Sequence, residues 1–317
     1  MKKIAIILGL AFAVLPAFAQ GRETMADKAK FKIAVGANLR ILDDNIWDYS
    51  KETIPEAWQK IGVDCRDAYR GPQFARLVSD YMPDVFGFQE YSKHMHDVFY
   101  PLVQKKGYVI AWESGADWNN TPIFYNSETI ELLYSNYMLY TPEQWSNHGS
   151  KSFTSAVFKR KAGGQTFALL CTHLWWKSDK VQPGSTLARA AQVRLMMAEA
   201  EIIRAQYPGI PVFVMGDMNC EEATIPMQQF IQGGYVPCYK AATVYADNHN
   251  GHHICSPTDG YSTESRRKGP DRATGAIDHL FVYDPARKAE VKVFECIMEE
   301  YTVPLTDHYP NFLDIKL

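Results

Sequence analysis

The sequence predicts an α/β fold in which two mixed β-sheets pack together and helices lie outside them. Apolar stretches of strand length outnumber stretches with helical periodicity, and many of them are neighbours in the chain. This order favours two packed mixed sheets over a single doubly wound sheet. No linker-like composition and no internal repeat divides residues 20–317, so we expect one domain there.

The individual elements follow from short apolar runs and from helical stripes. The expected strands cover residues 31–37, 85–88, 108–112, 123–125, 130–134, 153–159, 166–172, 211–215, 277–283 and 291–296. A helix is expected over residues 66–82, where apolar residues recur at helical spacing before Pro83. A second helix begins near Ser185, and its apolar stripe consists of Leu187, Ala191, Leu195, Ala198 and Ile202.

The first 19 residues have the pattern of a secretory signal peptide. Lys2 and Lys3 precede an apolar run over residues 4–15, and Ala17-Phe18-Ala19 supplies the small residues of a cleavage site. The run is shorter than the roughly 20 residues that a membrane-spanning helix needs. We therefore expect cleavage near Ala19, export to the periplasm or the extracellular space, and no transmembrane segment.

Charge and cysteine content limit the classes of function. Removal of the two leader lysines takes the net charge from −3 to −5. A negative net charge is unusual for a protein that binds along a long nucleic acid. The basic cluster Arg266-Arg267-Lys268 is more typical of a solvated loop than of a substrate contact. None of the six cysteines forms a Cys-x-x-Cys motif, so a structural zinc site is not indicated, and disulfides and free thiols both stay open.

Polar residues follow the apolar runs in a repeated manner. One polar cluster alone would be a turn or a cap, but six clusters in series indicate a functional site, because active-site groups gather at strand ends. The clusters are Asn38, Gln89-Glu90, Thr172-His173-Leu174, Gly216-Asp217-Met218-Asn219, Ile277-Asp278-His279 and Thr306-Asp307-His308.

This order of motifs resembles the endonuclease/exonuclease/phosphatase superfamily, which includes pancreatic-type deoxyribonucleases, inositol polyphosphate 5-phosphatases and bacterial sphingomyelinases. The resemblance extends from Asn38 to His308 and includes the sequence around Glu90. It implies a four-layer α/β sandwich. It also implies hydrolysis of a phosphoester, while the expectation of export rests on residues 1–19.

The resemblance assigns roles to eight residues. Glu90, Asn38 and Asp307 are the expected ligands of Mg²⁺, with Mn²⁺ as a substitute, since hard cations prefer oxygen ligands. His308, oriented by Asp278, is a candidate general base. Asp217 is the other candidate to take the proton of the attacking water, and the choice between them stays open. Asn219 would bind the water or a phosphate oxygen, and His173 would donate to the phosphate in the transition state.

Two positions depart from the family pattern. Arg40 stands two residues after Asn38, where some nucleases of the superfamily have an acidic metal ligand. Asn126 follows Tyr125 where many members have a phosphate-binding arginine. The first departure weakens an assignment to abasic-site repair, and the second means that another cation must bind the phosphate or that this contact is missing.

Several aromatic and histidine residues have two interpretations. Trp175 and Trp176 could stack against a substrate or simply pack in the core. His249, His252 and His253 could suggest zinc, but no cysteine or carboxylate completes a ligand spacing, so a polar loop is favoured.

Other functions remain as alternatives to hydrolysis of a small phosphoester or a phospholipid headgroup. A secreted nuclease acting on DNA or RNA shares the same expected core. A calcineurin-like phosphatase would need an early Asp-x-His and a Gly-Asn-His motif, which are missing. A glycan-binding or glycosidase domain would leave His173, Asn219 and His308 unexplained, and a non-catalytic phospho-ligand protein would be expected to have lost one of these positions. The sequence does not identify the substrate, the number of metals or the oligomeric state.

Overall fold

A computed structural model describes residues 29–49, 53–60, 62–112, 118–141, 145–146, 150–245, 255–256, 260–261 and 275–317. The expected leader, the basic cluster at 266–268 and the histidines at 249, 252 and 253 lie outside the described residues. Within the described part, no helix combines the length and the hydropathy needed to cross a lipid bilayer.

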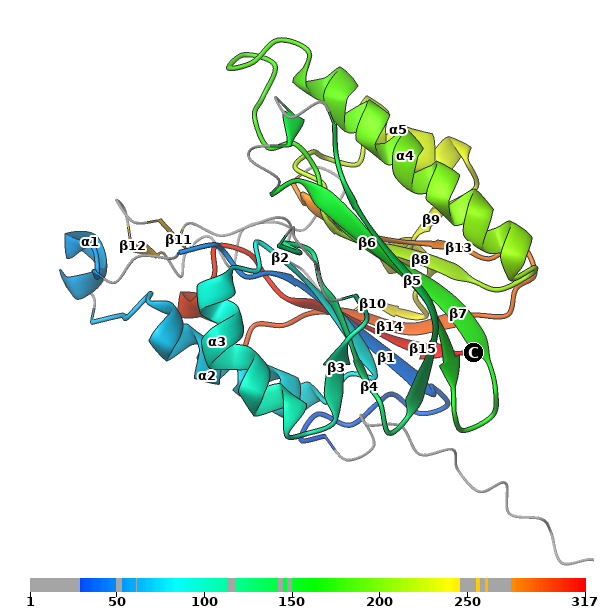
Figure 1. The fold of residues 1–317 in the computed structure, drawn as a ribbon, viewed down its shortest axis with the longest axis horizontal. Coiled ribbons are helices and arrows are strands. Elements are labelled where there is room, and N and C mark those ends of the chain that lie inside the picture. Colours follow the sequence, from blue (N-terminus) through cyan, green and yellow to red (C-terminus); the bar gives the residue numbers. More distant parts are fainter. Residues whose placement is uncertain are drawn as a thin grey trace, which may run out of the picture.

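Two mixed sheets pack face to face with helices outside them, as predicted (Figure 1). The seven-stranded sheet has the order β10 (Val244–Tyr245), β14 (Glu290–Cys296), β15 (Asn311–Lys316), β1 (Leu39–Asn45), β2 (Val85–Gln89), β4 (Ile123–Asn126) and β3 (Tyr108–Ile110). The six-stranded sheet has the order β5 (Ile130–Leu139), β6 (Ser152–Arg160), β7 (Thr166–His173), β8 (Val212–Asp217), β13 (Asp278–Tyr283) and β9 (Val236–Pro237). A separate short pair consists of β11 (Cys255–Ser256) and β12 (Gly260–Tyr261).

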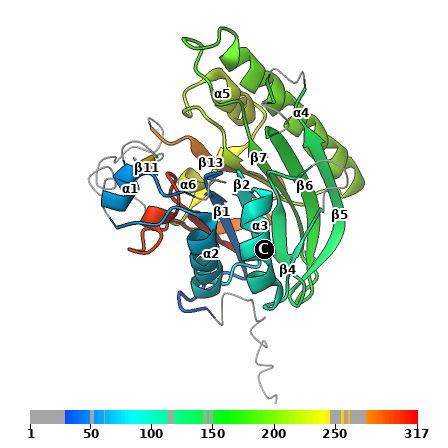
Figure 2. The same cartoon turned by 60° about the vertical axis from the view of Figure 1, so that its left-hand side comes forward.

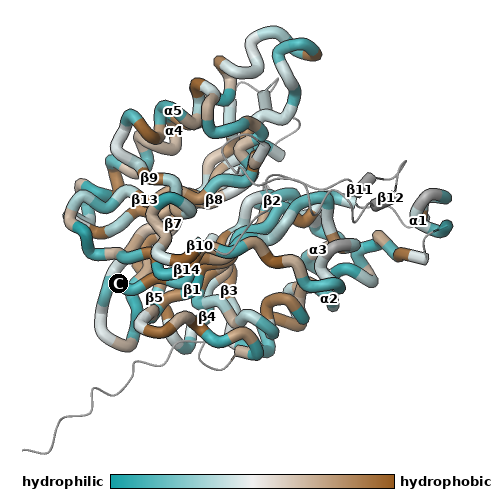
Figure 3. The backbone as a smooth tube through the Cα atoms, turned by 180° about the vertical axis from the view of Figure 1, so that it is seen from behind, coloured by the Kyte–Doolittle hydropathy of each residue, from teal (hydrophilic) through white to brown (hydrophobic). Residues whose placement is uncertain are grey.

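The helices cover the two outer faces, which completes the four layers (Figure 2). On the seven-stranded sheet lie α2 (Asp67–Tyr81) and α3 (Lys93–Gln104), and on the six-stranded sheet lie α4 (Ser185–Gln206) and α5 (Ile225–Gln232). Three short helices lie in connections: α1 (Glu56–Lys60), α6 (Cys238–Ala241) and η5 (Val303–Leu305). Figure 3 shows hydrophobic residues recurring within the strands of both sheets.

Alternating side chains build one apolar core between the sheets and one under each helix pair. In β1, Leu39 and Ile41 face the opposite sheet, whereas Leu42 faces α2 and α3. This is the period of two that a strand buried on both faces requires. Five of the described cysteines are buried and form no disulfide: Cys65, Cys171, Cys220, Cys238 and Cys296.

The first strand was misplaced by the sequence prediction. Residues 31–37 form no strand, and the chain instead turns through Gly36 (φ 82°) before β1 begins at Leu39. The polar residues of β1 interrupt its apolar pattern, so the sequence analysis did not identify this strand. Arg40 is buried because its guanidinium binds Asp314 of β15, with Nε 2.6 Å from Oδ1 and Nη2 2.8 Å from Oδ2. Pairing of this kind is what allows a charge to lie inside a sheet. The strand β15 was not predicted either.

The second long helix is confirmed, but the predicted stripe lies on its outer face. Leu187 and Ile202 of that stripe are 67% and 50% exposed. The buried face contains Val193, Met196 and Ile203, and it also carries Glu199, which accepts hydrogen bonds from Tyr134 and Ser155 of the sheet. These buried polar residues interrupt the apolar pattern of the correct face.

The two sheets lie in close contact at Gly87 of β2. A Cβ at this position would lie 2.3 Å from Met215 Cε of β8 and 2.7 Å from Cys171 Sγ of β7. The absence of a side chain therefore sets the spacing of the sheets beside the polar ends of their strands.

We predict that Gly87→Ala lowers the free energy of unfolding by about 1–3 kcal/mol, the usual effect of overpacking a filled core. Chemical denaturation of the variant and the parent chain measures the difference. An unchanged midpoint would show that the sheets have room at this point.

Candidate functional site

The polar ends of strands from both sheets meet along one edge of the sandwich. In the six-stranded sheet, His173 of β7 and Asp278 of β13 both lie beside Asp217 of β8 in the register. In the seven-stranded sheet, Asn45 pairs with Gln89, and Glu90 follows directly. Parallel strands bring their carboxyl ends to the same edge, which is where open α/β sheets place ligands.

Two of the strand-end residues have an unusual backbone conformation. Glu90 has a φ of 59° and Asn219 a φ of 52°, both in the left-handed region that side chains other than glycine rarely adopt. Such conformations concentrate at functional sites. Gly216, just before Asp217, has a φ of 135°, and a Cβ there would lie 2.0 Å from the Thr172 carbonyl oxygen. Only glycine fits between β7 and β8 at this point.

Asn45 links the two sheets across the site. Its Nδ2 donates to Asp217 Oδ2 at 3.0 Å and to Glu90 Oε1 at 3.3 Å. The backbone N–H of Asp48 donates to the other Glu90 oxygen at 2.8 Å. The carboxylate of Glu90 is thus held from two sides and remains partly open to the cavity, with a side-chain exposure of 30%.

His308 and Asp278 form a buried pair. Nδ1 of His308 lies 2.8 Å from Asp278 Oδ2 and 3.0 Å from Oδ1, so Nε2 faces the cavity, 3.8 Å from Asp217 Oδ2. Burial lowers the pKa of His308, but Asp278 and the other nearby carboxylates raise it well above its usual value. Thr306 holds this loop against β1, because its hydroxyl donates to the Asn45 carbonyl oxygen.

Lys151, just before β6, is a site residue that the sequence analysis did not identify. Its Nζ lies 2.5 Å from Nε2 and 3.1 Å from Nδ1 of His173, and its side chain is buried. Burial lowers its pKa to about 8, although Glu90 and Asp217 oppose that shift. β6 is antiparallel to β7, so its first residues lie at the active edge. Only the topology of the sheet reveals this placement.

These residues line a polar cavity of about 440 Å³. The lining comprises Asp48, Glu90, Asn120, Ser150, Lys151, His173, Trp176, Asp217, Asn219, Ile277, Asp307 and His308. Trp176 is 51% exposed and faces the cavity. Trp175 is buried and its indole N–H donates to Ser185, so the two tryptophans have different environments.

The carboxylates of the cavity lie close enough to perturb one another. Burial, with repulsion from Glu90, raises the pKa values of Asp48 and Asp307 to about 6. Burial also raises the pKa values of Asp217 and Glu90, but His173 and the other nearby cations outweigh it and hold both below their usual values.

This donor set fits a hard divalent cation. Glu90, His173 and Asp217 offer ligand atoms within 4.8 Å of one another, and Asp217, Asp278 and His308 form a second such group. In the second group Asp278 already has both oxygens on His308, which favours the first group and the neighbouring Asp307. Oxygen ligands from a few carboxylates are what Mg²⁺ prefers.

The structure brings seven of the eight predicted residues together and excludes Asn38. Both amide atoms of Asn38 bind the backbone of Leu317, with Oδ1 accepting at 2.8 Å and Nδ2 donating at 3.1 Å. Asn38 lies at the other end of β1, about 20 Å from Asn45 at strand rise. Because β1 begins at Leu39, Asn45 takes the place predicted for Asn38.

The positions of Arg40 and Asn126 in the structure explain the two departures from the family pattern. Arg40 pairs with Asp314 inside the sheet, so it does not replace a metal ligand. Asn126 ends β4, which is antiparallel to β2, and it donates to the Lys106 carbonyl oxygen away from the cavity. Lys151 is the lysine that the cavity contains.

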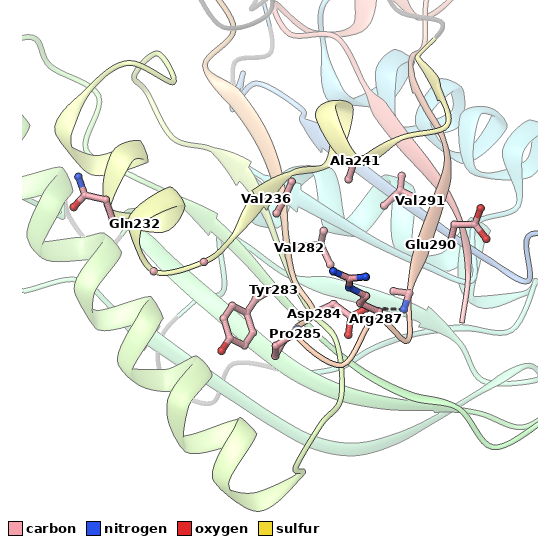
Figure 4. A pocket seen from close by; sticks show the side chains of 13 residues that line it. Gln232, Val236, Ala241, Val282, Tyr283, Asp284, Pro285, Arg287, Glu290 and Val291 are labelled. Atoms are coloured by element: carbon pink, nitrogen blue, oxygen red, sulfur yellow. Dashed lines mark hydrogen bonds between the residues drawn. The ribbon is translucent and has the colours of Figure 1, made fainter.

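A larger cavity of about 740 Å³ lies elsewhere, between the α5–β9 connection and the β13–β14 turn (Figure 4). It is lined mainly by Val236, Val282, Tyr283, Pro285 and Val291 (Figure 4). Arg287 and Glu290 lie at its side, but it has no cluster of carboxylates and histidines. Its chemistry therefore does not suit the hydrolysis of a phosphoester.

Comparison with known proteins identifies the family of this fold and site. The profile of the Endonuclease/Exonuclease/phosphatase family matches residues 65–308, which confirms the resemblance seen in the sequence. No curated protein matches the chain significantly.

Solved structures share the fold at low sequence identity. An endonuclease/exonuclease/phosphatase from Bacteroides vulgatus is 20% identical, with 88% of this chain and 98% of that chain covered and a TM-score of 0.63. A mannosyl-6-phosphatase from Bacteroides thetaiotaomicron is 17% identical, with coverages of 88% and 99% and a TM-score of 0.65. D. rerio TDP2, complexed with a single-stranded DNA product, is 16% identical, with coverages of 88% and 99% and a TM-score of 0.58.

We predict that Mg²⁺ or Mn²⁺ binds the chelator-treated protein and that Glu90→Gln weakens this binding by more than about 10-fold, since even partners outside the metal's ligands cost about 10- to 100-fold. Calorimetric titration measures the affinity. Glu131→Gln, which removes an exposed carboxylate paired with Lys159 on β5 and β6, is the control and should leave binding unchanged. Equal affinity of Glu90→Gln and the parent chain would place the metal elsewhere.

Proposed function

The chain belongs to the endonuclease/exonuclease/phosphatase family, and on that premise we propose that it is an exported, Mg²⁺-dependent hydrolase of small phosphoesters. The observation that carries the proposal is the compact cavity in which Lys151, His173 and His308 face Glu90 and Asp217. Cations and carboxylates around one small volume suit a phosphate group together with a metal ion.

The metal would be held by Glu90, with Asp307 and Asp217 beside it and Asn45 fixing the carboxylates. A bound divalent cation supplies charge neutralisation for the phosphate oxygens. Lys151 and His173, which contact each other, donate to the non-bridging oxygens. In this role Lys151 replaces the arginine that many family members have after a tyrosine. A fixed lysine in a water-poor site stabilises the charge of the transition state without reorganisation.

Asp217 is the acceptor that we assign for the proton of the attacking water. Its pKa is held low, so it remains an ionised carboxylate at neutral pH, whereas the raised pKa of His308 keeps that imidazole protonated. His308, held by Asp278, therefore acts as a positioned cation next to the phosphate. Asn219 is placed by a hydrogen bond from its backbone N–H to Asp217 at 2.8 Å, and it borders the same cavity.

A small substrate is favoured over a nucleic acid by size and charge. The cavity of about 440 Å³ accommodates one phosphate and part of an attached molecule. The net charge of −3, or −5 without the leader, provides no general attraction for a polyanion. The structural similarity to the Bacteroides thetaiotaomicron mannosyl-6-phosphatase supports this preference. The single-stranded DNA product in D. rerio TDP2 supports a nuclease as the alternative.

Export is part of the proposal because of the sequence of residues 1–19. Sequencing of the mature N-terminus tests it, and Gln20 is the expected first residue. A protein that retained Met1 when expressed in a secreting host would overturn this part alone.

We expect the purified protein to release phosphate from small phosphoesters with Mg²⁺ and to lose this activity in EDTA. The substrate panel contains a hexose 6-phosphate, a nucleoside 5′-monophosphate, glycerol 3-phosphate, inositol phosphates, sphingomyelin, RNA and duplex DNA. Comparison of kcat/KM at physiological salt decides between the two candidate functions. Duplex DNA or RNA cleaved faster than every small ester would establish the nuclease, and full activity in EDTA would overturn the metal-dependent mechanism.

We predict that His308→Ala and His173→Ala each lower kcat by roughly 100-fold or more, as expected for groups that contact the reacting phosphate. His94→Ala, on the helix α3, is the matched control because His94 lies outside the cavity lining. Circular dichroism and the thermal midpoint check that the variants fold. A variant with near-normal kcat would remove that histidine from the mechanism.

We predict a bell-shaped dependence of kcat/KM on pH, with limbs near 6 and 8. Asp307 has its pKa raised to about 6, so it gains its charge as the pH rises through that value, and extra Mg²⁺ should move this limb to lower pH. Lys151 has its pKa lowered to about 8 by burial, so it is charged below that pH and the rate should fall above it.

The alkaline limb is tested with Lys151→Arg, because a guanidinium keeps its charge throughout this range. Its profile should stay level above pH 8 even if its rate is lower. A rate that instead rises above pH 8 in the parent chain would indicate that His308 must lose its proton, and so would make His308 the base.

A further inference from the structure

A second, aromatic cavity lies next to the catalytic one on the same edge of the seven-stranded sheet. It has a volume of about 210 Å³. Its lining comes from α3, from the end of β3 and from the segment before β4, and it consists of Tyr91, His96, Tyr100, Ile110, Trp112, Trp118, Asn119 and Pro122. No residue of this cavity has a role in the mechanism above.

The rings of this aromatic pocket are held in fixed positions by one another. Trp118 stacks on Tyr91 with centroids 6.0 Å apart and an interplanar angle of 16°. His96 stacks on Tyr100 at 4.9 Å and meets Trp118 edge-on at 5.4 Å. Nδ1 of His96 lies 3.1 Å from the Tyr91 hydroxyl, and the Trp118 indole N–H donates to the Tyr91 carbonyl oxygen at 2.5 Å. Tyr91, His96, Tyr100 and Trp118 are therefore each positioned by contacts within the protein.

Trp112 is the lining residue of this pocket that is prominently exposed, with 37% of its surface accessible to solvent. A tryptophan that remains this exposed beside a fixed aromatic wall provides a stacking surface. Its neighbour Asn119 uses its amide within the protein, donating to Thr154 and accepting from the Thr121 N–H. Contact with ring faces is thus the main interaction that this pocket offers.

The aromatic pocket and the catalytic cavity adjoin along two chain segments. Glu90 borders the catalytic cavity and Tyr91 borders the aromatic pocket, and the same relation holds for Asn120 and Asn119. The two segments are joined by a hydrogen bond from the Tyr91 N–H to the Asn120 carbonyl oxygen at 3.2 Å. Since consecutive Cα atoms are about 3.8 Å apart, the linings of the two cavities are contiguous at both segments.

We propose that the aromatic pocket is a substrate subsite that stacks a ring of the alcohol portion of the phosphoester, while the phosphate lies against Lys151 and His173. The inference rests on the proposed function, and it narrows the substrate class to ring-bearing phosphoesters. Both the flat face of a nucleobase and the apolar face of a hexose supply the chemistry that the pocket recognises. A ring-free ester such as glycerol 3-phosphate has no group to place there.

The test compares Trp112→Ala, Trp112→Phe and the parent chain on a nucleoside 5′-monophosphate, a hexose 6-phosphate and glycerol 3-phosphate. Trp112→Ala should raise KM for a ring-bearing ester by about 10-fold, within the range known for loss of one stacking contact. Its kcat should remain within about 2-fold, Trp112→Phe should restore most of the affinity, and glycerol 3-phosphate should show no change. The ring-bearing ester that is affected identifies the source of the ring.

Two further measurements keep the subsite and the proposed function separable. Tyr69→Ala removes a 43% exposed aromatic side chain of α2 that lines neither cavity, and it should change no parameter. Calorimetric binding of the two ring-bearing esters to Asp217→Asn, with and without Trp112→Ala, reports on the pocket without turnover. If the parent chain hydrolyses no ester, the proposed function fails, and binding alone then decides the subsite. Equal KM and equal binding for all ligands in Trp112→Ala would overturn the subsite.

Discussion

The whole site depends on two sheets ending at the same height along one edge. The hydrogen bond from Asn45 of one sheet to Asp217 of the other exists only at this alignment. Gly87 permits the approach just below it, and the parallel pairing of β1 with β2 and of β7 with β8 fixes the strand ends within each sheet. A slip of one residue in any of these strands would turn its terminal side chain to the other face. The packing of the core therefore also determines the geometry of the site.

The charges of the cavity are arranged for a cation and an anion that bind together. Besides burial, Glu90 and Asp217 raise the pKa of Asp307, while Lys151, His173 and His308 lower the pKa of Glu90 and Asp217. A phosphate with its metal satisfies both groups. The left-handed backbone at Glu90 and Asn219 indicates that local strain is tolerated to keep these side chains in position.

The fold and most of the site could be predicted from the sequence because the motifs follow strands whose apolar runs are uninterrupted. β2, β7, β8 and β13 have such runs, and their terminal residues were placed correctly. The prediction of β1 failed because Arg40, Asp43 and Asp44 are buried polar residues. Burial of such residues depends on partners that are distant in the chain, such as Asp314 for Arg40. For the same reason the buried face of α4 was missed, since Glu199 looks like a surface residue until its partners on β5 and β6 are known.

Lys151 and the environments of the two tryptophans could not be predicted for a different reason. A lysine before a strand has no periodic signal, and its importance comes only from the direction in which β6 runs. Trp175 and Trp176 are adjacent and chemically identical, but a change in chain direction after β7 sends one into the core and leaves the other at the cavity. The position of Lys151 and the burial of each tryptophan depend on the topology of the sheet and not on a local sequence pattern.

The position of β15 has a consequence for how the chain acquires its structure during synthesis. This strand follows every other strand in the sequence, yet it lies between β14 and β1 near the middle of its sheet. Until residues 311–316 emerge, β1 has no neighbour on one side, and Arg40 lacks its partner Asp314. Pairing of such distant segments is slow, because the entropy of closing a long loop is lost first. A chain built in this order can complete its seven-stranded sheet only when β15 is available.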